Sequence, residues 1–255
     1  MLDARRRACL DAIGIELWSR RTRTAATDGS MAGGLPAAVG ATDPASQSGH
    51  RNDAGPVSPE TAESALDTTP SLGWEDLRDA VAGCRACPLH EHRSQAVFGV
   101  GDPRASLMII GEAPGAEEDR QGEPFVGRAG QLLTAMLAAI GLRRDQVYIA
   151  NIVKCRPPGN RDPHSEEAAC CQPYLHRQIE LIAPRLILSV GRVSAHNLLG
   201  TEEAVGRLRG RTRRFDPGDI PLIVTYHPAY LLRRPKEKAK AWQDLQAVHR
   251  LLAAS

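Results

Sequence analysis

The chain has 255 residues, enough for one sizeable α/β domain with flanking material or for two small domains. Its hydrophobic content of 42% and charged content of 24% are ordinary for a globular protein, and a net charge of +2 neither favours nor excludes nucleic acid as a partner. No apolar run is long enough to cross a bilayer, and the first residues lack the apolar core and cleavage site of a signal peptide. We therefore expect no membrane association and a cytoplasmic location.

Three parts of the chain differ in composition. In residues 1–21 the apolar side chains between Leu10 and Trp18 recur close to helical spacing, which predicts a short amphipathic helix. Residues 22–73 are rich in Ala, Gly, Ser, Thr, Pro and Asp and lack Phe, Trp and Tyr. Such a segment cannot bury enough surface to offset the entropy of ordering it, so we predict a disordered linker. The folded domain is expected over residues 74–255.

Within that domain, apolar strands and helices alternate along the chain. The strand segments are short and nearly continuous in apolar residues, and each is followed by a segment with helical spacing. This alternation predicts an α/β fold whose mainly parallel sheet is covered on both faces by helices. The expected strands are residues 106–112, 146–151, 186–190 and 222–226, and the expected helices are residues 127–141, 165–182, a short one ending at 199, and 236–252.

Three peptides that follow predicted strands carry polar side chains suited to a binding site. Glu112 follows the first strand, Asn151 ends the second, and His227 follows the last. Taken singly, each could equally be a helix cap, a turn residue or a loop hydrogen-bonding group. In open α/β sheets, however, ligands bind beyond the carboxyl ends of the strands. The joint placement of these residues favours one site that recognises a polar heterocycle and handles a water molecule.

Phe125 lies in a loop rich in glycine and proline, in a chain that has only three phenylalanines. It either anchors this loop by packing under the domain or forms a stacking platform for a flipped base. The residues alone leave both interpretations open.

The six cysteines indicate metal or redox chemistry before they indicate disulfides, given the expected cytoplasmic location. Cys84 and Cys87 form a C-x-x-C pair, and Cys155, Cys170 and Cys171 lie near the second strand and the helix that follows it. Together they predict a four-thiolate site for either a structural zinc ion or a [4Fe–4S] cluster. Their spacing does not match a compact zinc ribbon. The remaining cysteine, in the N-terminal segment, is expected to be an isolated thiol.

Basic residues concentrate in residues 207–214 and 233–240. A run of charges is usually a solvated face, and this remains our interpretation for the lysines of the last helix. Arginines that flank the His227 loop are better placed to hold phosphates.

Four peptides carry a specific resemblance to a known family: Glu112-Ala-Pro-Gly-Ala-Glu-Glu-Asp119, Gly122-Glu-Pro-Phe-Val-Gly-Arg-Ala-Gly130, Asn151-Ile-Val-Lys-Cys-Arg-Pro-Pro158 and His227-Pro-Ala-Tyr-Leu-Leu-Arg233. These motifs resemble those of the thermophile-type, iron–sulfur uracil-DNA glycosylases, often called family 4. The resemblance runs from about Gly83 to the C-terminus. It implies a three-layer α/β/α sandwich with a central four-stranded parallel sheet. It also implies an enzyme of base excision repair that hydrolyses the N-glycosidic bond of uracil in DNA.

The same resemblance implies a [4Fe–4S] cluster. Its first three ligands match Cys84, Cys87 and Cys155, and the family spacing with the following Pro-Tyr-Leu places the fourth at Cys171. Cys170, one residue away, leaves that single assignment open.

The resemblance also assigns roles to the residues at the strand ends. The family's base-stacking phenylalanine matches Phe125, the asparagine that reads the uracil edge matches Asn151, and the histidine that contacts a uracil carbonyl matches His227. Glu112 and Glu118 match glutamates near the path of the attacking water.

Ala113 belongs to the substrate site but stands where the common superfamily pattern has an aspartate. We therefore expect water activation to be weaker than usual or to come from Glu112. The residues expected to contact DNA are Arg209, Leu231, Leu232 and Arg233.

Two other classes of protein compete with this interpretation. A nucleotide-binding or phosphate-transfer domain is suggested by the glycine-rich loop after the first strand, but neither G-x-G-x-x-G nor G-x-x-x-x-G-K-S/T occurs there. A non-enzymatic DNA-binding module with a structural metal leaves the three strand-end motifs unexplained. We therefore expect a monomeric enzyme that acts on uracil-containing DNA and binds repair or replication partners through its N-terminal segment.

Overall fold

The computed structural model describes residues 69–254, which lie within a single compact unit of the chain. The predicted N-terminal helix, residues 1–21, and residues 22–68 of the predicted linker lie outside the described residues. None of the helices in the described part of the chain combines the length and the apolar character needed to span a membrane.

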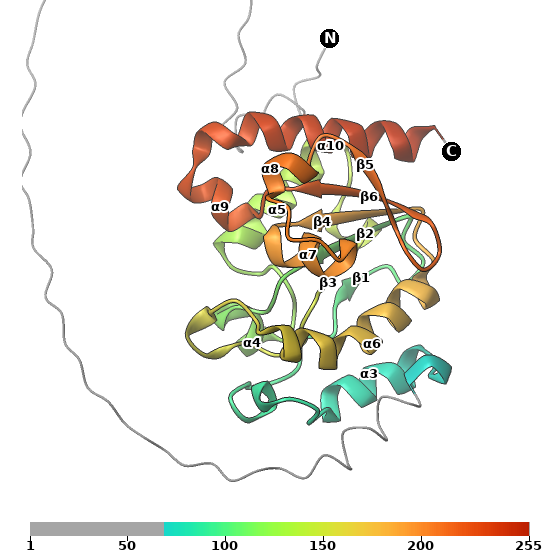
Figure 1. Ribbon diagram of the computed structural model, residues 1–255, viewed down its shortest axis with the longest axis vertical. Helices are drawn as coiled ribbons and strands as arrows, with labels where there is room; N and C mark the ends of the chain where they lie inside the picture. Colours follow the sequence, from blue (N-terminus) through green and yellow to red (C-terminus); the bar gives the residue numbers. More distant parts are fainter. Residues whose placement is uncertain (1–68, 255) are drawn as a thin grey trace, which may run out of the picture. The chain divides into compact units, whose positions relative to one another are not determined.

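Six strands form one mixed sheet (Figure 1): β1 (Val100–Gly101), β2 (Leu107–Gly111), β3 (Tyr148–Asn151), β4 (Leu186–Val190), β5 (Thr212–Phe215) and β6 (Ile220–Thr225). Their order is β1-β3-β2-β4-β6-β5. The inner strands β3, β2, β4 and β6 are parallel, whereas β1 and β5 pair with their neighbours in the antiparallel sense. The predicted four-stranded parallel sheet is thus the centre of a six-stranded one, and neither antiparallel edge strand was predicted from the sequence.

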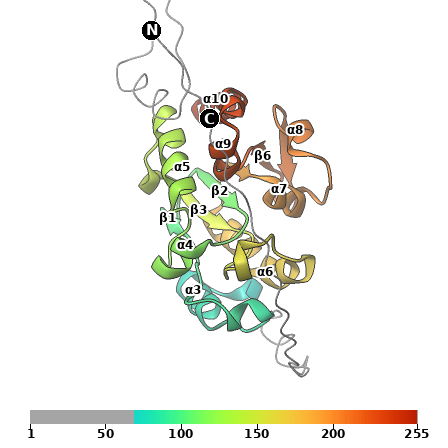
Figure 2. The same ribbon diagram turned by 90° about the vertical axis from the view of Figure 1, so that its left-hand side faces the viewer.

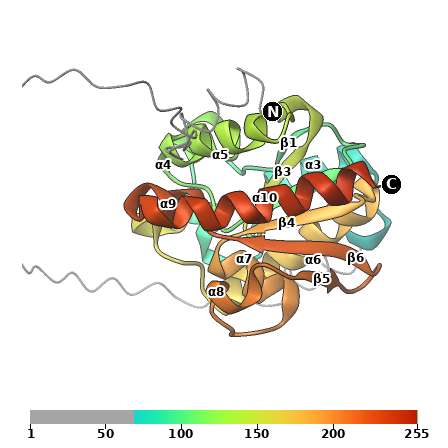
Figure 3. The same ribbon diagram turned by 90° about the horizontal axis from the view of Figure 1, so that it is seen from above.

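Helices cover both faces of this sheet, which confirms the predicted three-layer arrangement (Figures 1 and 2). They are α3 (Trp74–Gly83), α4 (Ala116–Gln121), α5 (Arg128–Ala139), α6 (Ser165–Ile182), α7 (Arg192–Leu199), α8 (Val205–Leu208), α9 (Pro228–Arg233) and α10 (Lys238–Ala253). Helices α6, α7 and α8 pack on one face, and α5, α9 and α10 pack on the other. Figure 3 shows α10 running across the second face.

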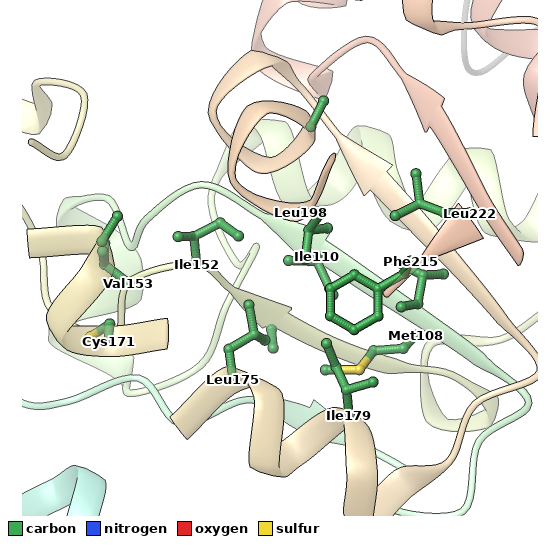
Figure 4. Close-up of a cluster of buried hydrophobic side chains, with 14 of the residues drawn as sticks. Met108, Ile110, Ile152, Val153, Cys171, Leu175, Ile179, Leu198, Phe215 and Leu222 are labelled. Atoms are coloured by element: carbon green, nitrogen blue, oxygen red, sulfur yellow. The ribbon is translucent and has the colours of Figure 1, made fainter. Parts of the chain in front are cut away.

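The strands alternate their side chains between two hydrophobic cores. In β2, Leu107 and Ile109 point to the core shared with α5 and α10, whereas Met108 and Ile110 point to the core shared with α6 and α7. Because helices cover both faces, every residue of this strand is buried, as the continuous apolar pattern predicts. Figure 4 shows the core shared with α6 and α7, in which Phe215 of the edge strand β5 packs.

The chain connections create a topological switch point at the carboxyl ends of the inner strands. From β2 the chain crosses to β3 on one side, whereas from β4 it crosses to β6 on the other. In open α/β sheets, ligands bind at such a switch point. Since β2, β3, β4 and β6 are parallel, the loops that follow them all leave the sheet at this edge.

The folded domain begins earlier than the predicted residue 74. The short 3-10 helix η1 (Thr69–Ser71) falls within the predicted linker, yet Thr69 is fully buried. The carbonyl of Leu72 accepts a 2.8 Å hydrogen bond from Nε of Arg177 in α6. Residues 69–73 therefore belong to the domain. The sequence gives no local sign of this, because their hydrogen-bond partner lies about a hundred residues later in the chain.

We expect a chain that lacks residues 1–68 to keep the melting temperature of the full chain. A chain that lacks residues 1–72 should melt about 2–4 °C lower, since the lost hydrogen bond contributes about 1 kcal/mol. Thermal unfolding followed by circular dichroism measures both truncations. Equal melting temperatures for the two would show that the contacts of η1 contribute nothing to stability.

Candidate active site

Asn151 and Phe125 meet over the end of β2. Asn151 is the last residue of β3 and lies opposite Gly111, the last residue of β2. A Cβ atom at Gly111 would come 2.4 Å from Oδ1 of Asn151 and 2.6 Å from the Phe125 ring. Glycine at this position therefore lets an amide group and an aromatic ring pack together over the strand end.

The amide of Asn151 is poised for a ligand. Its side chain is buried, and its Oδ1 has no hydrogen-bond partner among the described residues. Leaving a buried acceptor unpaired costs on the order of 1–3 kcal/mol, so such an atom indicates a group that arrives from outside. That group must carry an N–H or O–H donor and must fit against the Phe125 ring.

Phe125 is held in a left-handed backbone conformation, with φ of +55°, which is uncommon for residues other than glycine. Glu118 in α4 stabilises it: Oε1 accepts 3.0 Å hydrogen bonds from the N–H groups of Val126 and Gly127, and Oε2 accepts one of 3.1 Å from Gly115. Glu118 was predicted to bind substrate near the water path. In the structure its carboxylate also positions the loop that carries Phe125.

His227 forms the adjoining wall, with its ring centroid 5.6 Å from that of Phe125. Its Nδ1 accepts a 3.2 Å hydrogen bond from the N–H of Ala229 at the start of α9. Burial and the positive charge of Arg233 lower the pKa of His227 to about 4, against a smaller opposing effect of Glu118. The imidazole is therefore neutral at physiological pH, and since Nδ1 accepts, Nε2 carries the proton and can donate it to a ligand.

Glu112 follows β2 and lies beside Asp162 and Arg192. Burial, a hydrogen bond with Asp162 and the negative charge of Asp162 raise the pKa of Glu112 to about 7, although Arg192 opposes the shift. Arg192 also forms an ion pair with Asp162. A carboxyl group that titrates near neutral pH is suited to positioning water and taking up a proton. Ala113, next in the chain, packs against the core and brings no polar side chain to the site.

Asp162 and Arg192 are not among the residues predicted for the site. Asp162 lies just beyond the motif that follows β3, and Arg192 begins the helix after β4. The signal that points to Arg192 is its position directly after an inner parallel strand, β4, which is the same kind of position that Glu112, Asn151 and His227 occupy.

The cysteines of the described residues form a second cluster. All five are free thiols, and Cys87, Cys155 and Cys171 are buried in one hydrophobic core, in which Cys171 lies beside Val153 (Figure 4). Burial, reinforced by the charges of neighbouring cysteines, raises the pKa of Cys87 to about 11 and that of Cys171 to about 12. Because Cys84, Cys155 and Cys170 act on the thiol of Cys87, and Cys87 and Cys155 act on that of Cys171, these thiols lie within electrostatic reach of one another.

This donor set fits a group bound by thiolates. A buried thiol with a raised pKa gives up its proton when a metal cation takes up the negative charge. Nη1 of Arg93 lies 2.9 Å from Sγ of Cys155 and donates to it, and the N–H of Ala86 donates to Sγ of Cys84 at 3.5 Å. Thiolate ligands of iron–sulfur clusters accept such hydrogen bonds.

No three His, Cys, Asp or Glu side chains within residues 69–254 converge closely enough to enclose a single metal ion. Cysteine thiolates are the ligand type that both a structural zinc ion and an iron–sulfur cluster take.

Comparison with known proteins agrees with this geometry. The family model of the uracil DNA glycosylase superfamily matches residues 98–246. This chain belongs to that superfamily. Type-4 uracil-DNA glycosylases of Pyrobaculum aerophilum and Archaeoglobus fulgidus are 45% and 43% identical to it over 180 and 183 residues, which cover 68% and 69% of this chain and 92% of each relative. A type-5 uracil-DNA glycosylase of Pyrobaculum aerophilum is 28% identical over 194 residues, covering 64% of this chain and 85% of the relative, so the similarity is greater to type 4.

Four residues were predicted to contact DNA, and two of them are exposed to solvent. Leu232 is 37% exposed, and Arg233 beside it is also exposed. Leu231 is buried in the core between α9 and α10, because neighbouring residues of a helix point about 100° apart. Arg209 donates to both carboxylate oxygens of Asp244, at 3.0 and 2.9 Å. In the structure without DNA, Leu231 is thus buried and the guanidinium of Arg209 is paired with a carboxylate.

Proposed function

We propose that this member of the uracil DNA glycosylase superfamily hydrolyses the N-glycosidic bond between uracil and deoxyribose in DNA. The products are free uracil and an abasic site for base excision repair. The observation that carries the proposal is the buried, unpaired Oδ1 of Asn151 beside the Phe125 ring. Uracil meets both requirements of that site, since it is flat and carries an N3–H donor between two carbonyl oxygens.

Asn151 distinguishes uracil from cytosine by the polarity of its hydrogen bonds. Oδ1 accepts from N3–H of uracil, and the amide N–H donates to O4. Cytosine presents a bare N3 and an N4 amino group at these positions, so both contacts would bring like groups together. A buried site that leaves polar groups unpaired rejects the wrong base by up to about 10⁴–10⁵-fold.

Phe125 stabilises uracil after it has left the base stack. Flipping the nucleotide costs a few kcal/mol, and stacking on an aromatic ring recovers about 1–3 kcal/mol. We expect Phe125→Ala to weaken binding of uracil-containing DNA by about this amount, and by less in a U:G mispair, which opens more easily, than in U:A. Single-turnover cleavage as a function of enzyme concentration measures the effect on both duplexes. Phe125→Tyr, which keeps the ring, is the control, and equal half-saturation for the alanine and tyrosine variants would contradict this role.

His227 acts on the departing base. Bond cleavage leaves negative charge on uracil and an oxocarbenium-like sugar, and the Nε2–H of the neutral imidazole donates to the carbonyl oxygen that gains this charge. A donor that is already oriented by the Ala229 hydrogen bond needs no reorganisation during the reaction.

Glu112 positions the attacking water and, as a carboxylate, stabilises the cationic sugar. With a pKa of about 7, its carboxylate fraction falls about tenfold for each pH unit below that value. We therefore expect the single-turnover rate to rise with pH up to about 7 and to level off above it. His227 adds no slope above pH 5, because its pKa of about 4 keeps it neutral there.

Glu112→Gln should slow cleavage at pH 8 by about 100-fold and remove the slope, since the amide cannot titrate. The matched control is Glu202→Gln, which replaces an exposed glutamate that lies outside the site. A Glu112→Gln enzyme with the wild-type pH profile would show that another group titrates in the reaction.

We infer that Cys84, Cys87, Cys155 and Cys171 hold a [4Fe–4S] cluster. When bound, such a cluster would cross-link three segments that these cysteines place together although they are far apart in sequence: the C-x-x-C loop after α3, the loop after β3, and α6. None of the residues that face uracil is a cysteine, so the role that we assign to the cluster is structural.

The deciding experiment is a strand-cleavage assay on oligonucleotides that contain one uracil. We expect the purified holoenzyme to produce alkali-labile breaks at uracil and none where cytosine or thymine replaces it. Asn151→Ala protein, purified in the same way, controls for a contaminating glycosylase. No breaks in single-stranded, U:A and U:G substrates would contradict the proposed function.

We further propose that the protein works as a monomer in the cytoplasm, where the reducing environment keeps thiols available for iron. Arg233 and Leu232, both exposed beside the His227 helix, are the residues that we assign to DNA contact. We assign the binding of repair or replication partners to the N-terminal segment.

A further inference from the structure

A buried lysine lies between the strand-end site around Asn151 and the cysteine cluster. Lys154 lies between Val153 and Cys155 in the loop after β3, and its side chain is 1% exposed. Its ammonium group donates to the main-chain carbonyl of Asn151 at 3.0 Å and to Oε1 of Gln178 at 2.6 Å. Both acceptors are neutral, so neither balances its positive charge.

An ammonium group taken out of water needs negative charge close by. Among the described residues, no carboxylate forms an ion pair with Lys154, and the ionisable groups that act on it are Cys155 and Cys171. The backbone N–H of Lys154 also lies close enough to Cys171 to act on its thiol. These two cysteines are thus the ionisable groups closest in effect to this lysine, and as ligands of the proposed cluster they would carry the negative charge that it needs.

We propose that Lys154 is a positioning residue that joins the cysteine site to the base-reading Asn151, with its ammonium group fixing the Asn151 carbonyl while the cluster thiolates balance its charge. This inference rests on the proposed function, because it assumes that Asn151 reads uracil. Lys154 itself touches neither the base nor the reacting atoms.

The surroundings of Lys154 prevent the ammonium group from turning elsewhere. Nε2 of Gln178 donates to the carbonyl of Phe98 at 2.9 Å and to the hydroxyl of Tyr148 at 3.3 Å, so its Oε1 is held facing the lysine. The carbonyl of Lys154 accepts a 2.8 Å hydrogen bond from the N–H of Val97. With both its backbone and its acceptor fixed, the lysine constrains the end of β3 at Asn151.

Arg93 provides a matched control for the charge of Lys154. Its guanidinium donates to Sγ of Cys155 at 2.9 Å and to the carbonyls of Ala82 and Cys84 at 2.7 and 3.0 Å. It therefore brings a cation to the same thiols, but none of its hydrogen bonds reaches Asn151. Removing either cation should affect the cluster, and only the loss of Lys154 should affect the reading of the base.

The experiment compares wild-type, Lys154→Met and Arg93→Met holoenzymes. Calorimetric titration with free uracil measures base binding, iron content measures occupancy, and redox titration measures the cluster potential. We expect both variants to shift the potential to more negative values, because each removes a positive charge beside the thiolates. Lys154→Met should bind uracil about tenfold more weakly, the loss expected for one hydrogen bond from a charged group. Arg93→Met should bind it within about twofold of wild type.

Wild-type uracil affinity in Lys154→Met would overturn the proposal, and so would an equal loss of affinity in both variants, since the effect would then come from the cluster alone. If Lys154→Met is insoluble, Gln178→Met decides, because it removes one acceptor of the ammonium group and leaves the lysine in place. We expect severalfold weaker uracil binding with full iron content; unchanged binding overturns the proposal. A wild-type enzyme that neither binds uracil nor cleaves uracil-containing DNA would contradict the proposed function instead.

Discussion

Replacing His227 with alanine should slow single-turnover excision of uracil by about 100- to 1,000-fold. This is the cost of removing one preorganised donor from a negative charge that develops in the transition state. The donor is Nε2–H, since Nδ1 is occupied by the N–H of Ala229 and the imidazole is neutral. Because the charge is small before the bond breaks, binding of uracil-containing DNA should change little. Rates at saturating enzyme and binding by fluorescence anisotropy separate the two effects.

His249→Ala is the matched control, because His249 is exposed on α10 and lies away from the strand ends. It should cleave at the wild-type rate. If His227→Ala proved as fast as wild type at saturating enzyme, stabilisation of the leaving base would have to come from backbone N–H groups or another side chain.

Replacing Cys171 with serine should remove the iron from the purified protein, whereas replacing Cys170 with serine should leave it in place. Cys171 is buried and lies in the same core as Cys87 and Cys155, while Cys170 is only partly buried and packs at the edge of that core. Successive residues of α6 point about 100° apart, so only one of the two is well directed at a site between the other thiols. Iron content, visible absorption and melting temperature measure the outcome.

Loss of iron in Cys171→Ser should come with a lower melting temperature and a lower soluble yield. The thiols are brought together only in the folded chain, so binding of a metal group to them stabilises the folded state alone. Cys84→Ser should behave in the same way. The opposite result, with iron lost in Cys170→Ser and kept in Cys171→Ser, would move the fourth ligand by one residue. A Cys171→Ser protein without iron that keeps full activity and wild-type melting temperature would contradict a structural role for the cluster.

Residues at the edges of the domain show where local patterns stop being informative. The strand β5 contains Arg213 and Arg214 and is only partly buried, so it has neither the apolar run nor the clean alternation that predicted the inner strands. It forms because β6, a few residues later, offers free backbone groups for antiparallel pairing. The charged side chains then protect the edge from pairing with another sheet.

The sequence by itself determined the inner strands, the helices that cover them and the position of Glu112, Asn151 and His227 at strand ends. These features depend on apolar periodicity and on turn chemistry, which are local properties. Only the tertiary structure decided that Glu118 holds the Phe125 loop, that Arg209 pairs with Asp244, and that Leu231 faces the core while Leu232 faces solvent. It also placed Asp162 beside Glu112 and Lys154 between Asn151 and the cysteines. These contacts join segments whose spacing along the chain carries no periodic signal, so they are set by how the helices and loops pack around the sheet.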